Sequence, residues 1–150
     1  MRKSTIKASM LGGIAFIGLL FIGLKSDTTS VVDEGIVFEH VDFKQAKELA
    51  KAQNKLIFID AYTTWCGPCK LMAKTVFTEK EVGDFYNSNF INIKVDMETA
   101  EGMFLAKQFA VQGYPTFLYL NAKGEIVHRT IGASDKFAFL NHGKKAVKLK

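Results

Sequence analysis

Two cysteines, Cys66 and Cys69, stand three positions apart directly after a short apolar run, and the chain has no others. A pair this close cannot staple distant parts of a fold, so it is a redox centre, half of a metal site or a local bridge. The run before it, Leu56–Ala61, predicts a buried strand. A helix after that strand would begin at Cys66, so the fold must provide a strand–helix junction there.

A helix start favours the thiolate form of Cys66. Unpaired backbone N–H groups and the positive end of the helix dipole face the sulfur, and a lowered thiol pKa raises the nucleophilic fraction. Cys69, nearly one turn further on, is expected to be more buried and to attack a mixed disulfide at Cys66. Pro68 suits the first turn, Gly67 leaves access, and Trp65 offers an apolar docking surface.

Other interpretations of the cysteine pair are weaker. A zinc site needs about four ligands, whereas the chain adds only three scattered histidines, His40, His128 and His142. A structural bridge would add little because the loop it closes is tiny, and inert buried thiols are weaker still. No metal and no cofactor are expected, and His128, on a predicted hairpin strand, is interpreted as packed or exposed rather than as a ligand.

The N-terminal residues have the composition of an export signal. Residues 1–9 are basic and polar, and residues 10–24 are uncharged and almost wholly apolar. The uncharged run, residues 8–24, is at the short limit for spanning a bilayer, so a cleaved signal peptide and a retained membrane anchor both stay open. Either would leave the positive N-terminus in the cytoplasm and export the domain, to a periplasmic or membrane-anchored position.

Charge is unevenly distributed along the chain. The net charge of +5 comes from the two ends, and the part between them holds 12 basic and 15 acidic residues. A nucleic-acid partner is therefore not expected. The predicted domains are residues 1–25 as signal or anchor, residues 26–41 as a linker leading into the fold, and residues 42–150 as the globular domain.

Beyond the linker, helical and strand periodicities alternate. Helices are expected at Asp42–Asn54, after Cys66, from a capping box at Thr78–Glu81 to about Asn87, at Glu98–Ala110, and after Ser134 or Asp135. Strands are expected at Leu56–Ala61, Phe90–Asp96, Thr116–Leu120 and Glu125–Ile131. This order implies an α/β fold with a central mixed sheet flanked by helices on both faces. Eight phenylalanines are assigned to its core: Phe77, Phe85, Phe90, Phe104, Phe109, Phe117, Phe137 and Phe139.

The sequence resembles the thioredoxin family over roughly residues 42–148. The segment Trp65–Lys70 (WCGPCK) matches the family's active-site motif in full, and Gly113–Thr116 (GYPT) resembles its cis-proline loop. Within the family, Thr75–Val82 and Asp96–Val111 look most like the periplasmic C-terminal domain of the thiol:disulfide interchange protein DsbD and its exported relatives. The resemblance implies the thioredoxin fold.

The resemblance also implies roles for a proline and its neighbours. Pro115 would be cis and would pack beside Cys66, and the backbone of Tyr114 would meet a substrate strand. Tyr114 and Thr116 would then contact the substrate. Tyr114 replaces the usual aliphatic residue, which bears on substrate choice.

A further implied role falls on an acid in the first strand. Asp60, six residues before Cys66, matches the family's buried acid. Burial should raise the pKa of Asp60 and let it exchange a proton with Cys69. Lys94 is the predicted partner of Asp60 across the sheet.

These features predict a thiol–disulfide oxidoreductase that reduces protein disulfides outside the cytoplasm. Gly-Pro between the cysteines resembles the strongly reducing family members, and a membrane-embedded protein is the expected electron donor. Three alternatives stay open: an oxidant or isomerase using the same pair, a binding module without turnover, and a membrane-tethered assembly factor, for example in cytochrome maturation.

Overall fold

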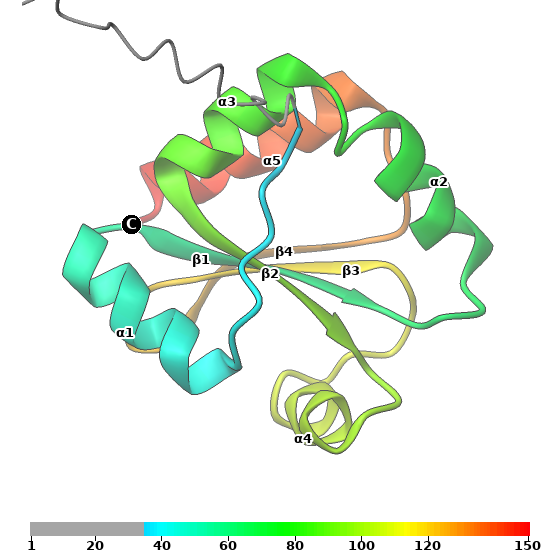
Figure 1. Cartoon of the computed structure of the whole chain (residues 1–150), viewed down its shortest axis with the longest axis horizontal. Coiled ribbons are helices and arrows are strands. Elements are labelled where there is room, and N and C mark those ends of the chain that lie inside the picture. Colours follow the sequence, from blue (N-terminus) through cyan, green and yellow to red (C-terminus); the bar gives the residue numbers. More distant parts are fainter. Residues whose placement is uncertain (1–34) are drawn as a thin grey trace, which may run out of the picture. The chain divides into compact units, whose positions relative to one another are not determined.

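The computed structural model describes residues 35–150, which contain one four-stranded mixed sheet in the order β2-β1-β3-β4 (Figure 1). β1 (Leu56–Tyr62) runs parallel to β2 (Phe90–Asp96) and antiparallel to β3 (Thr116–Leu120). β4 (Ile126–Ile131) pairs antiparallel with β3. The predicted mixed sheet is confirmed, whereas the predicted N-terminal hydrophobic helix lies outside the described residues.

Within residues 35–150, five helices cover the two faces of this sheet. They are α1 (Phe43–Gln53), α2 (Gly67–Thr75), α3 (Lys80–Asn89), α4 (Ala100–Gln108) and α5 (Lys136–Lys148). Figure 1 shows α2, α3 and α5 on one side of the sheet and α1 and α4 on the other. The order of elements within the described chain is the one that the sequence predicts.

Strand β1 is buried on both faces, as its continuous apolar run predicts. Phe58 faces the aromatic core under α3 and α5, where Tyr86 and Phe139 stack with ring centroids 4.6 Å apart. Ile57 and Ile59 face the second core, under α1 and α4. The central position of β1 fixes the strand end from which the cysteine motif departs.

Helix capping agrees with the sequence at α5 and differs at α3. Asp42 caps α1 through the Gln45 amide, and Asp135 caps α5. The capping box expected at Thr78 is wrong, because α3 begins after Glu79 and has no side-chain cap. Thr78 Oγ1 instead donates to the carbonyl of Lys74 at 3.1 Å. The Thr78 hydroxyl therefore bonds to the end of α2, and it does not cap the start of α3 as the sequence predicts.

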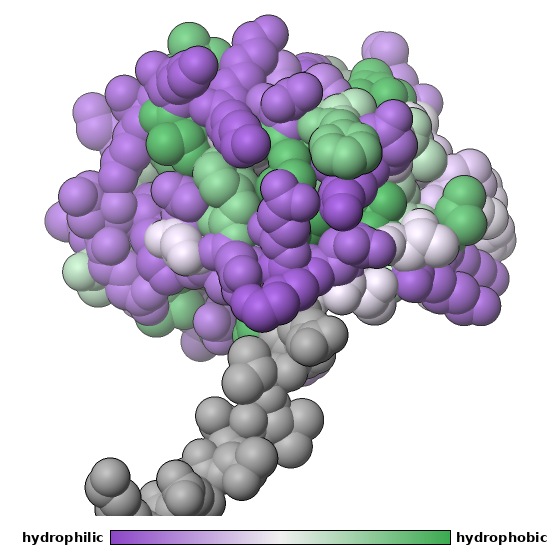
Figure 2. Space-filling model, turned by 90° about the horizontal axis from the view of Figure 1, so that it is seen from above, coloured by the Kyte–Doolittle hydropathy of each residue, from purple (hydrophilic) through white to green (hydrophobic). Residues whose placement is uncertain are grey.

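The predicted aromatic core is wrong at two of its eight positions. Phe104 on α4 and Phe137 on α5 are 66% and 69% exposed. On α4 the next residue, Leu105, is buried in place of Phe104. On α5 Phe139, two residues after Phe137, is buried instead. Figure 2, turned by 90° about the horizontal axis so that the molecule is seen from the top of Figure 1, shows hydrophilic side chains over most of that face with apolar ones between them.

An extended segment before α1 packs along the sheet. The Ile36 amide donates to the Phe77 carbonyl at 2.7 Å, and the Glu39 amide donates to the Asn92 carbonyl at 2.8 Å. Phe38 lies in contact with the rings of Phe58 and Phe77. Among residues 35–150, no helix has the length and apolar character needed to cross a membrane.

Candidate active site

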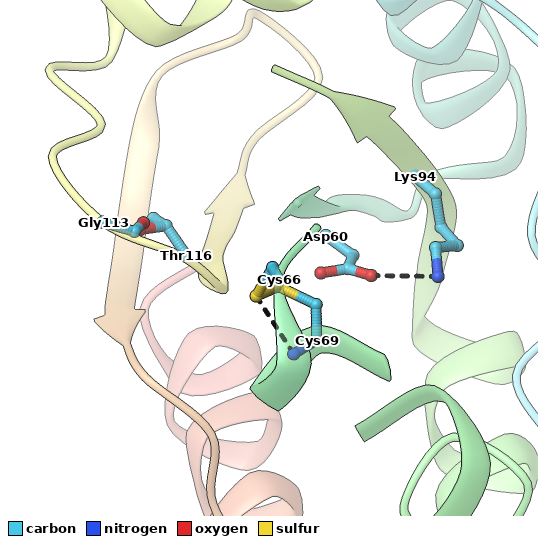
Figure 3. Close-up of a disulfide and its surroundings, with 6 residues drawn as sticks. All are labelled: Asp60, Cys66, Cys69, Lys94, Gly113 and Thr116. Carbon is cyan, nitrogen blue, oxygen red and sulfur yellow. Dashed lines mark hydrogen bonds and ion pairs between the residues drawn. A yellow bond between two sulfur atoms is a disulfide. The ribbon is translucent and has the colours of Figure 1, made fainter. Parts of the chain in front are cut away.

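Cys66 and Cys69 form a disulfide at the junction of β1 and α2 (Figure 3). Cys66 is the N-cap of α2, and its Sγ accepts a hydrogen bond from the Cys69 amide at 3.1 Å. The Cys69 amide is free to bond this sulfur because residues at a helix start have no carbonyl of a preceding turn to bond. The predicted position of Cys66 is confirmed.

Both sulfurs are deeply buried in this oxidised form. The exposed fraction is 3% for Cys66 and 5% for Cys69, so the expectation that Cys69 is the more buried residue is wrong. The disulfide itself explains this, because it draws the two side chains into one site at the end of the sheet. A substrate would therefore have to reach Cys66 in the reduced protein, or through the small part of its sulfur that is exposed.

The two residues between the cysteines leave one side of the junction open. Pro68 lies in the first turn of α2, where no backbone N–H is required. Gly67 is exposed, and a Cβ built on it would meet no atom within 4 Å. The space at Gly67 is consequently not filled by side chains from more distant described residues.

Asp60 is a buried acid in the middle of the sheet, only 1% exposed. Lys94, its register partner on β2, places Nζ 3.3 Å from Asp60 Oδ2, so the predicted pairing is confirmed. Neither carboxylate oxygen accepts a hydrogen bond from the described residues. Burial raises the pKa of Asp60 from 3.8 to about 6, and the Lys94 charge opposes that rise. In Figure 3 the carboxylate is drawn between the disulfide and Lys94.

A small pocket of about 100 Å³ lies between Lys94 and Cys69. Its walls include Thr63, Cys69 and Lys94. The Thr63 hydroxyl is buried and, like the Asp60 oxygens, has no hydrogen-bond partner among residues 35–150. Unpartnered buried oxygens are uncommon in folded proteins, and both Asp60 and Thr63 carry them at this site.

Three aromatic rings surround the Lys94 ammonium. Its Nζ lies 4.9 Å from the centre of the Tyr62 ring, 5.3 Å from Phe38 and 5.7 Å from Phe77. Contacts of this kind attract a cation through the negative face of the ring. They hold Lys94 beside Asp60 while leaving it 31% exposed.

The proline loop faces the motif from β3. The Tyr114–Pro115 bond is cis, as the resemblance implies, and the Pro115 carbonyl accepts from the Gly132 amide at 2.8 Å. Thr116 Oγ1 donates to the Gly113 carbonyl at 2.7 Å, and Figure 3 draws both residues near the disulfide. The loop is thus fixed by its own hydrogen bonds.

Tyr114 and Trp65 bring the loop and the cysteine motif together. Their rings meet edge to face with centroids 5.9 Å apart. Trp65 is 65% exposed, and its Nε1 donates to Glu98 Oε1 at 2.9 Å. The indole therefore has a fixed orientation and a free apolar face beside Cys66.

The sequence did not reveal Glu98, Thr63 or the ring of Phe38 as parts of this site. Glu98 was assigned only to a helix, and it lies 33 residues from Trp65. The only feature of the sequence that could have pointed to Thr63 is its position, as a polar residue between the first strand and the cysteine motif. Within residues 35–150 there is no group of three or more histidine, cysteine or acidic side chains that could hold a metal ion.

A cysteine pair at disulfide distance on a helix start, with a buried acid and a cis-proline loop around it, defines a thiol–disulfide oxidoreductase. The chain belongs to the thioredoxin family, whose model, described as Thioredoxin, matches residues 36–145. It is therefore a thioredoxin-like thiol–disulfide oxidoreductase with a Cys66–Cys69 pair.

Individual relatives agree with this assignment. Thioredoxin-1 of Drosophila melanogaster is 33% identical over 102 residues, which are 68% of this chain and 89% of that protein. The thiol:disulfide interchange protein DsbD of Pseudoalteromonas atlantica is 32% identical over 107 residues, 69% of this chain but only 18% of the much longer DsbD. The similarity to DsbD that the sequence predicts is confirmed for that segment.

A solved structure is similar over most of the described fold. The solution structure of a candidate disulphide isomerase from Bacteroides thetaiotaomicron has a TM-score of 0.70 and 43% sequence identity. The alignment covers 77% of this chain and 96% of that one.

Proposed function

We propose that this chain reduces disulfide bonds of protein substrates outside the cytoplasm. The observation that carries the proposal is the position of Cys66 at the start of α2, with the Cys69 amide directed at its sulfur. In the reduced protein, the same amide and the helix dipole stabilise a thiolate at Cys66. Cys66 is then the nucleophile and Cys69 the resolving thiol.

The exchange moves two electrons from the chain to the substrate. The Cys66 thiolate attacks one substrate sulfur, forms a mixed disulfide and releases the other substrate sulfur as a thiolate, which takes a proton from solvent. Asp60, as a carboxylate, accepts the proton of Cys69. The Cys69 thiolate then attacks the Cys66 sulfur, closes the internal disulfide and releases the second substrate thiolate. A reducing partner must afterwards return two electrons.

The substrate would dock as an extended segment against the proline loop. Tyr114 precedes β3 and lies outside the ladder, which begins where Thr116 faces Ala61, so its backbone groups are left for a substrate strand. Trp65 and Tyr114 offer aromatic faces on either side of that strand. The open space at Gly67 gives the substrate sulfur its approach to Cys66.

The reducing direction is supported by Gly-Pro between the cysteines, as in thioredoxins of low potential. The reduction potential of thioredoxin itself is about −270 mV and that of the oxidant DsbA is about −120 mV. The Bacteroides relative favours a second candidate, an isomerase using the same pair. A potential above about −170 mV would reject the reductase, and catalysed reshuffling of scrambled disulfides without net reduction would favour the isomerase.

The first 25 residues and the similarity to DsbD support the proposed location and electron donor. An export signal or anchor over residues 8–24 would deliver the domain across the membrane, and a membrane-embedded protein would carry electrons to it. A fusion of residues 1–41 to alkaline phosphatase tests export. Activity of the reporter is expected, and an inactive reporter retained in the cytoplasm would contradict the proposed location.

The proposed chemistry is tested by trapping substrates in cells with Cys69→Ser. This variant can form the mixed disulfide at Cys66 but cannot resolve it, so protein adducts that disappear on treatment with dithiothreitol are expected. The doubly substituted Cys66→Ser/Cys69→Ser chain is the matched control and should capture none. Turnover of insulin by the unaltered chain separates a catalyst from a binding module; capture equal in both variants would contradict the assigned nucleophile.

A further inference from the structure

Two histidines from different elements meet on the side of the sheet that carries α5. His128 lies on β4 and His142 on α5, and both are half-buried. His128 Nε2 lies 3.3 Å from His142 Nδ1, and the ring planes are inclined by 30°. Strand pairing puts His128 opposite Tyr119, three residues along β3 from Thr116. This cluster is thus separate from the cysteine motif.

The spacing of the two nitrogens matches that of two ligands on one metal ion. Zinc binds imidazole nitrogen at about 2.0–2.1 Å in a tetrahedral arrangement, which places two such nitrogens about 3.3 Å apart. We propose that His128 and His142 form a two-histidine site for a divalent transition metal such as Zn²⁺ or Ni²⁺. Two coordination positions would be left for water or a further ligand.

The ring of His128 is oriented by its surroundings before any metal arrives. Tyr119 stacks on it with centroids 5.5 Å apart and planes inclined by 27°. Tyr119 is itself fixed, because its hydroxyl pairs with that of Tyr86 at 2.8 Å. A ligand held by its neighbours loses little rotational freedom on binding, which favours coordination.

Metal binding at this pair would rearrange one proton and oxidise nothing. Without metal, one ring donates its N–H to the other across the 3.3 Å contact. With metal, both facing nitrogens give their lone pairs to the ion, and the proton moves through solvent to the outer nitrogen of the same ring. Burial and the nearby Lys145 charge lower the pKa of both rings, which favours the neutral form that ligates. The same Lys145 charge also opposes a cation at the site.

Calorimetric titration of the full chain with ZnCl₂ and NiCl₂ tests the proposal. The protein is kept oxidised so that the Cys66–Cys69 disulfide cannot supply thiolates. One ion per chain is expected to bind, and His128→Gln or His142→Gln should weaken it by more than the roughly tenfold typical of a lost outer partner. His40→Gln, which alters the only other histidine of the chain, should leave the affinity unchanged.

Lys145→Gln gives a result that a purely structural histidine pair would not produce. Removing the nearby positive charge should tighten metal binding by about two- to fivefold. A measurement without any substitution guards against variants that misfold: paramagnetic Ni²⁺ should broaden the ring resonances of His128 and His142 before those of His40. Absence of binding at millimolar metal, unchanged affinity in both histidine variants, or equal broadening of all three rings would overturn the proposal.

Discussion

Two polar pairs lie on the same face of the sheet, each with a deeply buried member, and they differ in whether the hydrogen bonds of that member are satisfied. The Tyr86 hydroxyl meets that of Tyr119 at 2.8 Å and donates to the Phe139 carbonyl at 2.9 Å. Asp60 is just as buried, yet neither of its oxygens accepts a hydrogen bond from the described residues, and Lys94 meets it only as an ion pair.

The difference separates a structural pair from a reactive one. A satisfied buried pair stabilises one packing of the core, and burial keeps both tyrosines neutral by raising their pKa. An acid without hydrogen-bond donors costs stability when it is ionised, but its pKa of about 6 lets it change protonation near neutral pH. The Asp60–Lys94 pair is therefore less stabilising but can transfer a proton, whereas the Tyr86–Tyr119 pair stabilises the core and stays neutral.

The largest expected effect is on the pH dependence of stability. The pKa of Asp60 is raised from 3.8 to about 6 on folding, so the folded chain binds more protons than the unfolded chain between these values. The contribution of Asp60 is fully present below pH 3.8 and is lost as the pH rises through 6. Between these two pH limits, the free energy of unfolding should fall by about 3 kcal/mol through Asp60.

Denaturant unfolding of the oxidised chain and of Asp60→Asn from pH 4 to pH 8 measures this effect. The unaltered chain should lose stability relative to the variant as the pH rises, because other acids titrate equally in both. Parallel stability curves would show that the Asp60 carboxylate is not destabilised by burial.

The next effect concerns catalysis by the reactive pair. Asp60→Asn removes the proposed proton acceptor of Cys69, and loss of such a group typically slows a reaction by about 100-fold or more. Insulin reduction at pH 7 should fall by this order, while alkylation of Cys66 in the reduced variant continues. A fall of less than threefold would exclude Asp60 as the main proton carrier.

The satisfied pair should respond in the opposite way. Tyr86→Phe leaves the Tyr119 hydroxyl and the Phe139 carbonyl without their partner, at a cost of about 2 kcal/mol of unfolding free energy. Tyr119→Phe is the matched control and should cost less, because Tyr86 still donates to Phe139. Both variants should reduce insulin at the unaltered rate. Slower insulin reduction by either variant would contradict the purely structural role of the tyrosine pair.

Much of the reactive site could be predicted from the sequence, because its residues are close together or in register. Cys66 and Cys69 share one turn, and Asp60 and Lys94 each hold a predictable strand position, which strand pairing then brings together. The capping box failed because Thr78 and Glu79 are adjacent candidates for one helix start. Local pattern alone does not choose between them.

The remaining contacts depend on tertiary packing that no local pattern records. Phe38 reaches Lys94 only because the segment before α1 crosses the sheet, and Glu98 reaches Trp65 from another loop. His128 was interpreted as packed or exposed, since nothing in the sequence shows that α5 returns His142 to it. Phe104 was assigned to the core because the helical period did not distinguish it from Leu105.

The smallest effect tests how Lys94 tunes the reactive pair. The charge of Lys94 lowers the pKa of Asp60, so Lys94→Gln should raise that pKa above about 6. Less carboxylate would then be available at pH 7, and the rate of insulin reduction should fall a few-fold and recover at higher pH. The effect is modest because Lys94 is 31% exposed and its charge is partly screened.

Lys94→Arg is the conservative control, since it keeps the positive charge beside the carboxylate. Its pH–rate profile should stay close to that of the unaltered chain, whereas that of Lys94→Gln moves to higher pH. A mere loss of packing would lower the rate at every pH without moving the profile. An unmoved pH–rate profile in Lys94→Gln would therefore mean that Lys94 and the aromatic rings around it only stabilise the fold. Asp60 would then act without any influence of Lys94 on its pKa.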